Sequence, residues 1–526
     1  MRKWLITGGI LLALIVAAVV TLFALRPTIH RIACEQMRKV LQTHFASSVE
    51  FSDFKVSLFP RVHVTVTGLV MRHKGRTDIP PLIEIREADA YANIPALMGP
   101  KPHISFVQLY GLQIHMPPRQ TGSQPLIQKT DQDLAKKYPV LFEEIHTDDA
   151  MIVVLRAQPD NPAREFPIHH LELHDVSFDR SSKFHAILTN AVPRGEIDAT
   201  GEFGPWLAEV PRATPGNGQY DFEDADLGTL KGLRGILSSK GRFVGPLDYL
   251  SVDGETDTPN FGLRTMGHPV PLHTDFSALV DGTNGDVILK SVTAKFLHTV
   301  LSVSGEIVDV SRETKGRTIL LNVVSSDARI EDLLRLAVSS DEPLMTGSAN
   351  LKTKISIPEG DADLLERMKL TGQFGVGGAQ FTSPEVQGKI DSLSRKGQGE
   401  PKNTDISEMV SELKGTFQAS NGVVSFSHLS FAVAGASLAL DGTYNLDSTE
   451  MNFHGNLTLQ AKLSQTTTGA KSFFLKAVDP FFKGKNGGTD VPIKIVGTKD
   501  HPSFGLDRGG YKNKDNSADA KKGSKP

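Results

Sequence analysis

The chain has 526 residues, which is too long for one ordinary compact core, so we expect several domains or one elongated architecture. Its 57 Lys and Arg residues nearly balance 60 Asp and Glu residues, which excludes the strong positive field that nucleic-acid binding needs. A single cysteine, Cys34, excludes an intrachain disulfide, and its helical surroundings favour a buried thiol over a nucleophile.

The N-terminal segment is strongly apolar. Residues 5–25 carry no charge and would form a helix about 31 Å long, enough to cross a hydrocarbon core of about 30 Å. A cleaved signal sequence is the alternative, but its apolar region is normally about 7–15 residues long and ends at small residues. We therefore predict an uncleaved transmembrane anchor over residues 1–26. Basic residues flank it on both sides, so charge alone does not orient it.

Beyond an amphipathic helix predicted over residues 29–44, the pattern becomes that of strands. Val62, Val64 and Val66 alternate with polar residues, which is the period of a strand with one apolar face. Further alternating stretches are interrupted by Gly or Asp, a sign of a bulge or bend within a strand. These stretches are residues 104–116, 168–179, 286–296 and 428–442, and longer uninterrupted ones cover 349–357 and 451–463. The predicted fold class is mainly β.

Turns and helices complete the pattern. Asn421-Gly422, Asp441-Gly442 and residues 444–450 predict hairpin connections. The predicted helices are few and short: 226–238, 329–338, 361–368, 384–393, 406–413 and 471–482. The last is rich in Phe and predicts either a cap on the end of a sheet or a surface that faces lipid or a partner.

Composition shifts suggest soft domain boundaries at polar segments rich in Gly and Pro. We predict an N-terminal β-region over 27–205, a middle β-region with a short helix over 206–325, and a C-terminal β-region over 326–507. Residues 508–526 are polar and basic and predict a disordered tail.

Signals for chemistry are weak. The glycine-rich run 375–381 lacks the last glycine of a dinucleotide fingerprint and predicts a turn or a bulge. The densest histidine group is His169, His170 and His174; on a strand, His170 and His174 would share a face with Glu172. A metal site is geometrically conceivable there, but the solvated face of a strand explains the group equally well. We predict no catalytic residues, no metal and no cofactor, and hence a protein that is not an enzyme.

Several stretches resemble the AsmA-like family of bacterial envelope proteins, which includes TamB-type proteins. Residues 49–74, "VEFSDFKVSLFPRVHVTVTGLVMRHK", and residues 82–116 are similar to the opening unit of that family. Residues 370–399, 413–446 and 491–507, the last reading "VPIKIVGTKDHPSFGLD", resemble its C-terminal region. The motifs are strand and turn signatures, so they bring no catalytic residues with them.

The resemblance implies a protein anchored in the inner membrane of a Gram-negative-type bacterium, with its N-terminus in the cytoplasm and its body in the periplasm. It implies an elongated, twisted antiparallel β-sheet curled into an apolar groove that conducts phospholipid or a related lipid in support of outer-membrane biogenesis. In this sequence the groove-lining residues would be Val62, Val64, Val66, Leu109, Leu351, Ile355, Met451, Phe453, Leu457, Leu459, Ile493 and Ile495.

A second interpretation remains open. The chain would instead be a non-enzymatic assembly scaffold for outer-membrane proteins, holding another envelope protein at exposed sheet edges or at its C-terminal end. Both interpretations predict partners in the inner membrane and the envelope, and neither involves nucleic acid.

Overall fold

The structure of this chain is a computed structural model. It describes residues 31–42, 45, 47–73, 75–99, 101–116, 140–155, 163–177, 179–207, 213–282, 285–309, 316–399, 411–446, 448–466, 488–498 and 501–507. The predicted anchor, the predicted helix over 471–482 and the C-terminal tail lie outside these residues.

Throughout these residues the fold is mainly β, as predicted, with strands β1 to β27 and a few short helices. The helices are residues 31–42, α2 (Ile94–Leu97), α4 (Ile330–Ala337), α5 (Leu364–Arg367) and α6 (Pro384–Gln398), with 3-10 turns η2 (Leu227–Thr229) and η3 (Leu463–Thr466). Within the described part of the chain, no helix combines the length and the apolar character that crossing a bilayer requires.

The chain divides into two compact units. Unit 1 comprises residues 1–225, 239–253 and 279–285, and unit 2 comprises residues 226–238, 254–278 and 286–526. Strands β14 (Ile236–Pro246), β15 (Leu250–Leu263) and β16 (Val270–Val280) contribute residues to both.

Unit 1 is a sheet in which β3 pairs with β1, β2 and β4, β4 pairs with β6, and β9, β10 and β11 follow one another. Its strands are β1 (Ser47–Glu50), β2 (Asp53–Ser57), β3 (Val62–His73), β4 (Ile83–Ala92), β5 (His103–Ile104), β6 (Phe106–Met116), β7 (Leu141–Thr147), β8 (Ala150–Val154), β9 (Arg164–Val176), β10 (Ser182–Ala191), β11 (Arg194–Phe203) and most of β12 (Pro215–Asp226).

One part of this sheet departs from the expected antiparallel pattern. Strands β7 and β8 both pair antiparallel with β9, but β6 runs parallel to both of them. Parallel neighbours need a connection of about a dozen residues or more. The chain between Met116 and Leu141 is long enough to make that crossover.

The interruptions noticed in the strand pattern are irregularities of the backbone. Gly68 in β3, Gly111 in β6 and Asp175 in β9 each have a positive φ. Arg86 lies between Gly68 and Gly111 in the register of β3, β4 and β6, so one line of irregularity crosses three strands. After Gly68, the odd-numbered residues Leu69 and Met71 lie in the same core as the even-numbered Val66. The irregularity therefore shifts the alternation of β3 by one residue.

The core of unit 1 lies on the apolar face of these strands. Val49, Phe54, Val66, Leu69 and Met71 are among its buried residues. The helix of residues 31–42 packs against it through Ala33, Cys34, Met37 and Leu41, which places the single cysteine at the edge of a core.

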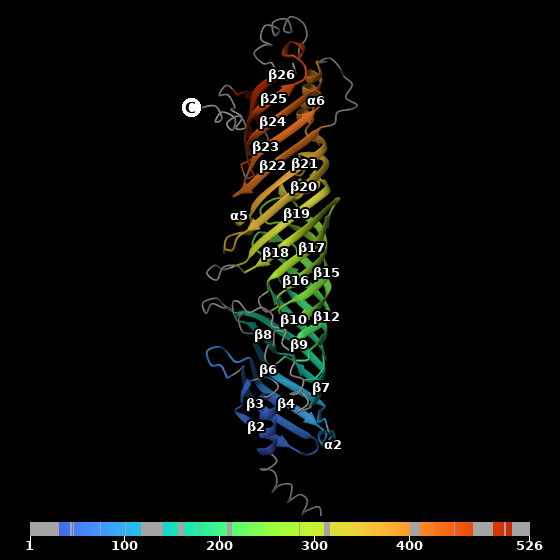
Figure 1. The fold of residues 1–526 in the computed structure, drawn as a ribbon, viewed down its shortest axis with the longest axis vertical. Helices are drawn as coiled ribbons and strands as arrows, with labels where there is room; N and C mark the ends of the chain where they lie inside the picture. Colours follow the sequence, from blue (N-terminus) through green and yellow to red (C-terminus); the bar gives the residue numbers. More distant parts are fainter. Residues whose placement is uncertain are drawn as a thin grey trace, which may run out of the picture. The chain divides into compact units, whose positions relative to one another are not determined.

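Unit 2 contains an antiparallel meander in which each strand from β17 to β27 pairs with the next, and Figure 1 shows β17 to β26 in this sequence order. Its strands are β13 (Leu233–Arg234), β17 (Val287–Phe296), β18 (Thr299–Val308), β19 (Thr318–Arg329), β20 (Met345–Ile357), β21 (Lys369–Phe381), β22 (Glu412–Ser420), β23 (Val423–Val433), β24 (Ala436–Asn445), β25 (Glu450–Leu459), β26 (Thr489–Thr498) and β27 (Pro502–Leu506).

Turn chemistry explains the connections from β22 to β23 and from β23 to β24. Asn421 and Gly422 both have positive φ and join β22 to β23, as predicted. Asp441-Gly442, by contrast, lies inside β24, so its prediction as a turn was wrong. The stretch 428–442 is likewise two strands of a hairpin that turns at Ala434-Gly435, where Gly435 has a φ of 80°.

The helix predictions were right at residues 329–338 and 384–393, which contain α4 and most of α6, and wrong at 226–238. That segment contains η2, β13 and the start of β14. Gly232 and Gly235 have positive φ there, which a helix cannot accommodate. Glu412 and Leu413 belong to β22, so the helix predicted over 406–413 does not extend to its predicted end.

Candidate functional site

A single apolar face runs through unit 2, because the register aligns the alternating residues of successive strands. Leu351 on β20 lies between Ser325 on β19 and Phe374 on β21, and Ile355 lies between Leu321 and Leu370. A second row passes through Phe426, Gly442, Phe453 and Ile495 on β23, β24, β25 and β26. The predicted lining residues of unit 2 therefore share one face of one sheet.

This face is only partly shielded from water. Leu351, Ile355, Met451, Ile493 and Ile495 are half-buried, which differs from a face closed by a second sheet. The opposite face of the same strands is polar and exposed, with Lys352, Lys354, Gln373 and Lys414 among its residues.

Glycines on the apolar face show which way the sheet bends. A Cβ placed at Gly305, Gly442 or Gly455 would overlap a carbonyl oxygen of the neighbouring strand. Gly377, on the polar face of β21, has no atom within 4 Å of such a Cβ. Neighbouring strands therefore fold toward the apolar side at these glycines, and the apolar face is the concave one.

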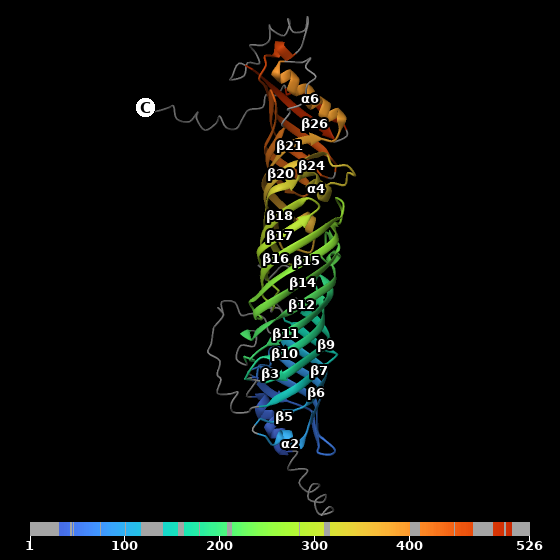
Figure 2. The ribbon, with the colours of Figure 1, turned by 90° about the vertical axis from the view of Figure 1, so that its right-hand side faces the viewer.

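Helices cover part of the concave face. Ile390 and Leu393 of α6 pack against a cluster that includes Phe431, Leu457 and Leu459, and Figure 2 shows α6 lying across the strands at that end. Near α4, Ile330 and Leu333 pack on Ala349 and Val376. Leu457 and Leu459 are thus within a packed cluster, whereas Leu351 and Ile355 lie outside both clusters.

In unit 1 the predicted lining residues belong to a closed core or its margin. Val66 is buried in that core, Val64 and Leu109 pack against it, and Val62 is also buried. The helix of residues 31–42 packs against the same core, so it covers part of the surface on which these side chains lie.

Strand β27 carries exposed apolar side chains. Phe504 and Leu506 on β27 are 57% and 52% exposed and lie opposite Ile495 and Ile493 on β26. Among the described residues, β27 pairs with β26 alone, so its other edge offers backbone groups for pairing.

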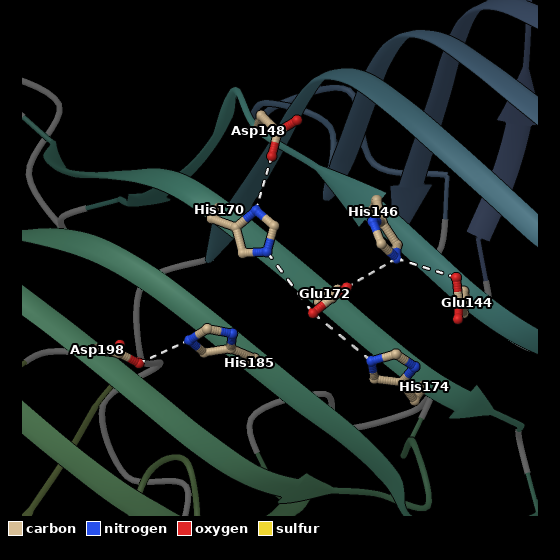
Figure 3. Close-up of polar contacts among 8 residues, drawn as sticks. All are labelled: Glu144, His146, Asp148, His170, Glu172, His174, His185 and Asp198. Atoms are coloured by element: carbon tan, nitrogen blue, oxygen red, sulfur yellow. Dashed lines mark hydrogen bonds and ion pairs between the residues drawn. The ribbon is translucent and has the colours of Figure 1, made fainter.

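The polar face of unit 1 carries the densest group of titratable side chains. His146 on β7, Glu172 on β9 and His185 on β10 are register neighbours, and His170 and His174 flank Glu172 along β9 (Figure 3). Leu171 and Leu173 alternate with them on β9.

Sequence reasoning found part of this group and missed the rest. His170 and His174 stood out because they are close in sequence, but His146 and His185 come from other strands. His169 is not part of the group, since its Nε2 lies 2.7 Å from Thr189 Oγ1. Only the strand register reveals which histidines meet.

A scan against protein-family models, a search of curated proteins and a search of solved structures each gave no match.

Proposed function

We propose that this protein binds acyl lipids on the concave apolar face of unit 2 and conducts them within the bacterial envelope, in the manner implied by its resemblance to AsmA-like proteins. The observation that carries the proposal is the concave apolar face that continues from strand to strand through half-buried Leu351 and Ile355 and through the row in which Phe453 is buried and Ile495 is half-buried.

The energetics favour an acyl chain as the occupant. Each CH₂ group moved from water onto an apolar surface gains about 0.8 kcal/mol, so a chain lying across several strands would gain several kcal/mol. The lipid headgroup would remain in water at the rim. Movement along such a face involves no covalent chemistry, which agrees with the prediction of a non-enzymatic protein.

Location and role follow from the same proposal. The apolar segment over residues 5–25 would anchor the chain in the inner membrane, with the N-terminus in the cytoplasm and the β-units in the periplasm. Phospholipid or a related lipid would enter from that membrane, and its transfer would support outer-membrane biogenesis.

The test is lipid analysis of the full chain after purification and extensive washing in a lipid-free amphipol. We expect co-purifying phospholipid by mass spectrometry, and its loss in Ile355→Lys, which places an ammonium on the concave face. Ser356→Lys is the matched control, because its side chain is on the opposite face, between Leu320 and Lys369. Equal lipid in the two variants, or no lipid in the native chain, would overturn the proposal.

The exposed edge strand β27 supports a second candidate, a scaffold that holds unfolded outer-membrane proteins by strand pairing. Deleting residues 502–526 should then abolish binding of a purified, urea-denatured outer-membrane β-barrel protein, while Ile355→Lys should leave it intact. The reverse result would favour lipid conduction.

A further inference from the structure

A cluster on the polar face of unit 1 has a geometry that lipid binding does not explain. Its members come from adjacent strands: His170 and Glu172 from β9, and His185 from β10. One nitrogen or oxygen atom from each of these three side chains lies within 4.8 Å of the others. We call these three residues the histidine–glutamate triad.

Glu172 is the centre of the cluster. Its Oε2 lies 3.9 Å from His170 Nε2, and its Oε1 lies 3.2 Å from His146 Nε2 (Figure 3). Within the described part of the chain, His146 Nε2 is buried and makes no hydrogen bond of acceptable geometry, despite its closeness to Glu172. The imidazoles thus surround a carboxylate without satisfying it by regular hydrogen bonds.

Outer carboxylates orient two of the imidazoles. Asp148 Oδ1 lies 2.9 Å from His170 Nδ1, and Asp198 Oδ1 lies 2.9 Å from His185 Nε2. Because a carboxylate accepts a hydrogen bond from the ring N–H that it contacts, the lone pair of each neutral ring is on the other nitrogen, which in His170 is the one nearest Glu172. Carboxylates placed behind imidazoles in this way are typical of histidines that bind metals.

We propose that the histidine–glutamate triad binds a divalent transition-metal ion, and that Zn²⁺ is the ion that fits it best. Imidazole and carboxylate ligands suit Zn²⁺, whereas Mg²⁺ and Ca²⁺ prefer oxygen ligands alone. Zinc binds its ligands at about 2.0–2.2 Å, so the donor atoms must approach one another by roughly 1 Å. All three side chains of the triad are half-buried.

The bound ion would join β9 to β10 and leave a fourth position for water or another ligand. His146 would remain beside the second oxygen of Glu172 and hold the carboxylate in place. His174 lies on the other side of Glu172, with its Nε2 3.8 Å from Glu172 Oε2, but it is not one of the three side chains whose donor atoms all lie within 4.8 Å of one another. We therefore leave His174 out of the ligand set.

A second group in unit 2 provides a contrast. Glu255, His273 and Asp275 also bring their donor atoms within 4.8 Å of one another. However, Lys295 Nζ lies 3.0 Å from Asp275 Oδ2. An ammonium group already occupies the place of a cation, so this group should not bind zinc.

The test measures Zn²⁺ binding to the full chain, by competition with a chromophoric chelator and by metal analysis after desalting. We expect saturable binding that His170→Ala, His185→Ala and Glu172→Gln each weaken at least tenfold. The isosteric Glu172→Gln change keeps the size of the side chain, so it separates ligand loss from misfolding. Co²⁺ substituted into the site should show d–d absorption bands that these variants lose.

The controls are His174→Ala and His273→Ala, which should bind Zn²⁺ within twofold of the native chain. An equal concentration of Zn²⁺ should also raise the melting temperature of the native chain by more than that of Glu172→Gln. Native-like affinity in all three triad variants, or no saturable Zn²⁺ binding by the native chain, would overturn the proposal. Neither outcome bears on lipid binding, because the proposed lipid-binding surface is the concave apolar face of unit 2 and the triad belongs to unit 1.

Discussion

The ring of Phe453 on β25 occupies the space that a side chain at Gly442 on β24 would need. The two residues are register partners, and a Cβ at Gly442 would lie 2.7 Å from Phe453 Cδ1. Glycine inside a strand normally weakens it, but here it allows an aromatic side chain to lie across the concave face. Gly442 of the Asp441-Gly442 pair therefore makes room for the ring of Phe453 and does not form a turn.

Replacing Gly442 by Ala should destabilise unit 2 by about 1–3 kcal/mol, because the added methyl group collides with the ring and with the neighbouring strand. The measurement is the midpoint of urea unfolding followed by circular dichroism. Gly377→Ala is the control, since a Cβ there has no atom within 4 Å, and it should change stability by less than about 0.5 kcal/mol. Similar losses in the two variants would contradict this account of the concave face.

Asp332 of α4 accepts hydrogen bonds from the turn between β17 and β18. Its Oδ2 accepts hydrogen bonds from the backbone N–H of His298 and the hydroxyl of Thr299, each at 2.9 Å, and it is buried. Asp332→Ala would leave both donors unsatisfied and should cost about 2–3 kcal/mol. Asp332→Asn keeps a carbonyl acceptor and should cost less.

The same urea experiment checks the Asp332 prediction, and proteolysis adds local information. Since α4 packs on Ala349 and Val376, its release should expose the adjacent strands and speed cleavage near residues 330–345. If Asp332→Ala and Asp332→Asn unfold at the same urea concentration, the two hydrogen bonds do not hold the helix.

Protonation of Asp179, which forms an ion pair with Lys101, should make the fold less stable in acid. Lys101 Nζ lies 2.8 Å from its Oδ2 and Ser177 also hydrogen-bonds to it, and together they lower the pKa of Asp179 to about 2. A carboxyl group whose pKa is lower in the folded state stabilises the fold above its unfolded pKa of about 3.8. That contribution is lost as the pH falls from about 5 to about 2.

The magnitude should be about 1 kcal/mol or less, because the carboxylate is 40% exposed and surface ion pairs are screened. Asp179→Asn should therefore be less stable than the native chain at pH 7 and equal to it near pH 2. In the background of Lys101→Met the same substitution should have a smaller effect. A difference between native and variant that persists unchanged down to pH 2 would exclude this linkage.

Local patterns in the sequence predicted where the strands lie better than which strands pair with one another. Alternation identified β3, β20 and β25, and the Asn421-Gly422 turn identified a hairpin, because these signals depend on neighbouring residues. The parallel pairing of β6 with β7 depends on a long connection, which leaves no local pattern. Strand β12 was also missed, since its Pro215, Gly216 and Gly218 are typical of loops.

The candidate sites show the same division. Alternation assigned Leu351, Ile355 and Ile495 to an apolar face, and the register placed them on one surface. Which part of that face a helix covers depends on tertiary packing, so the presence of Leu457 and Leu459 in one cluster with residues of α6 could not be predicted. The meeting of Glu172 with His146 and His185 likewise required the register of three strands.

The fit of α6 on the concave face depends on small residues. Ser394 Oγ donates a hydrogen bond to the carbonyl oxygen of Ala434 at 2.8 Å, and a Cβ at Gly397 would overlap the carbonyl oxygen of Gly435. The helix thus rests directly on the turn between β23 and β24. A side chain at residue 397 would lift it from the strands.

Gly397→Ala should therefore displace α6 and expose the apolar residues beneath it, including Leu457 and Leu459. We expect stronger fluorescence of a hydrophobic dye and a lower unfolding midpoint, by about 1–2 kcal/mol, even though Ala favours helix formation. Gly388→Ala on the same helix is the matched control: a Cβ there is in open space, so the change should stabilise the chain by up to about 1 kcal/mol without added dye binding. Because helix propensity changes equally in both variants, opposite shifts isolate the contact with Gly435, and shifts of the same sign would show that the contact is unimportant.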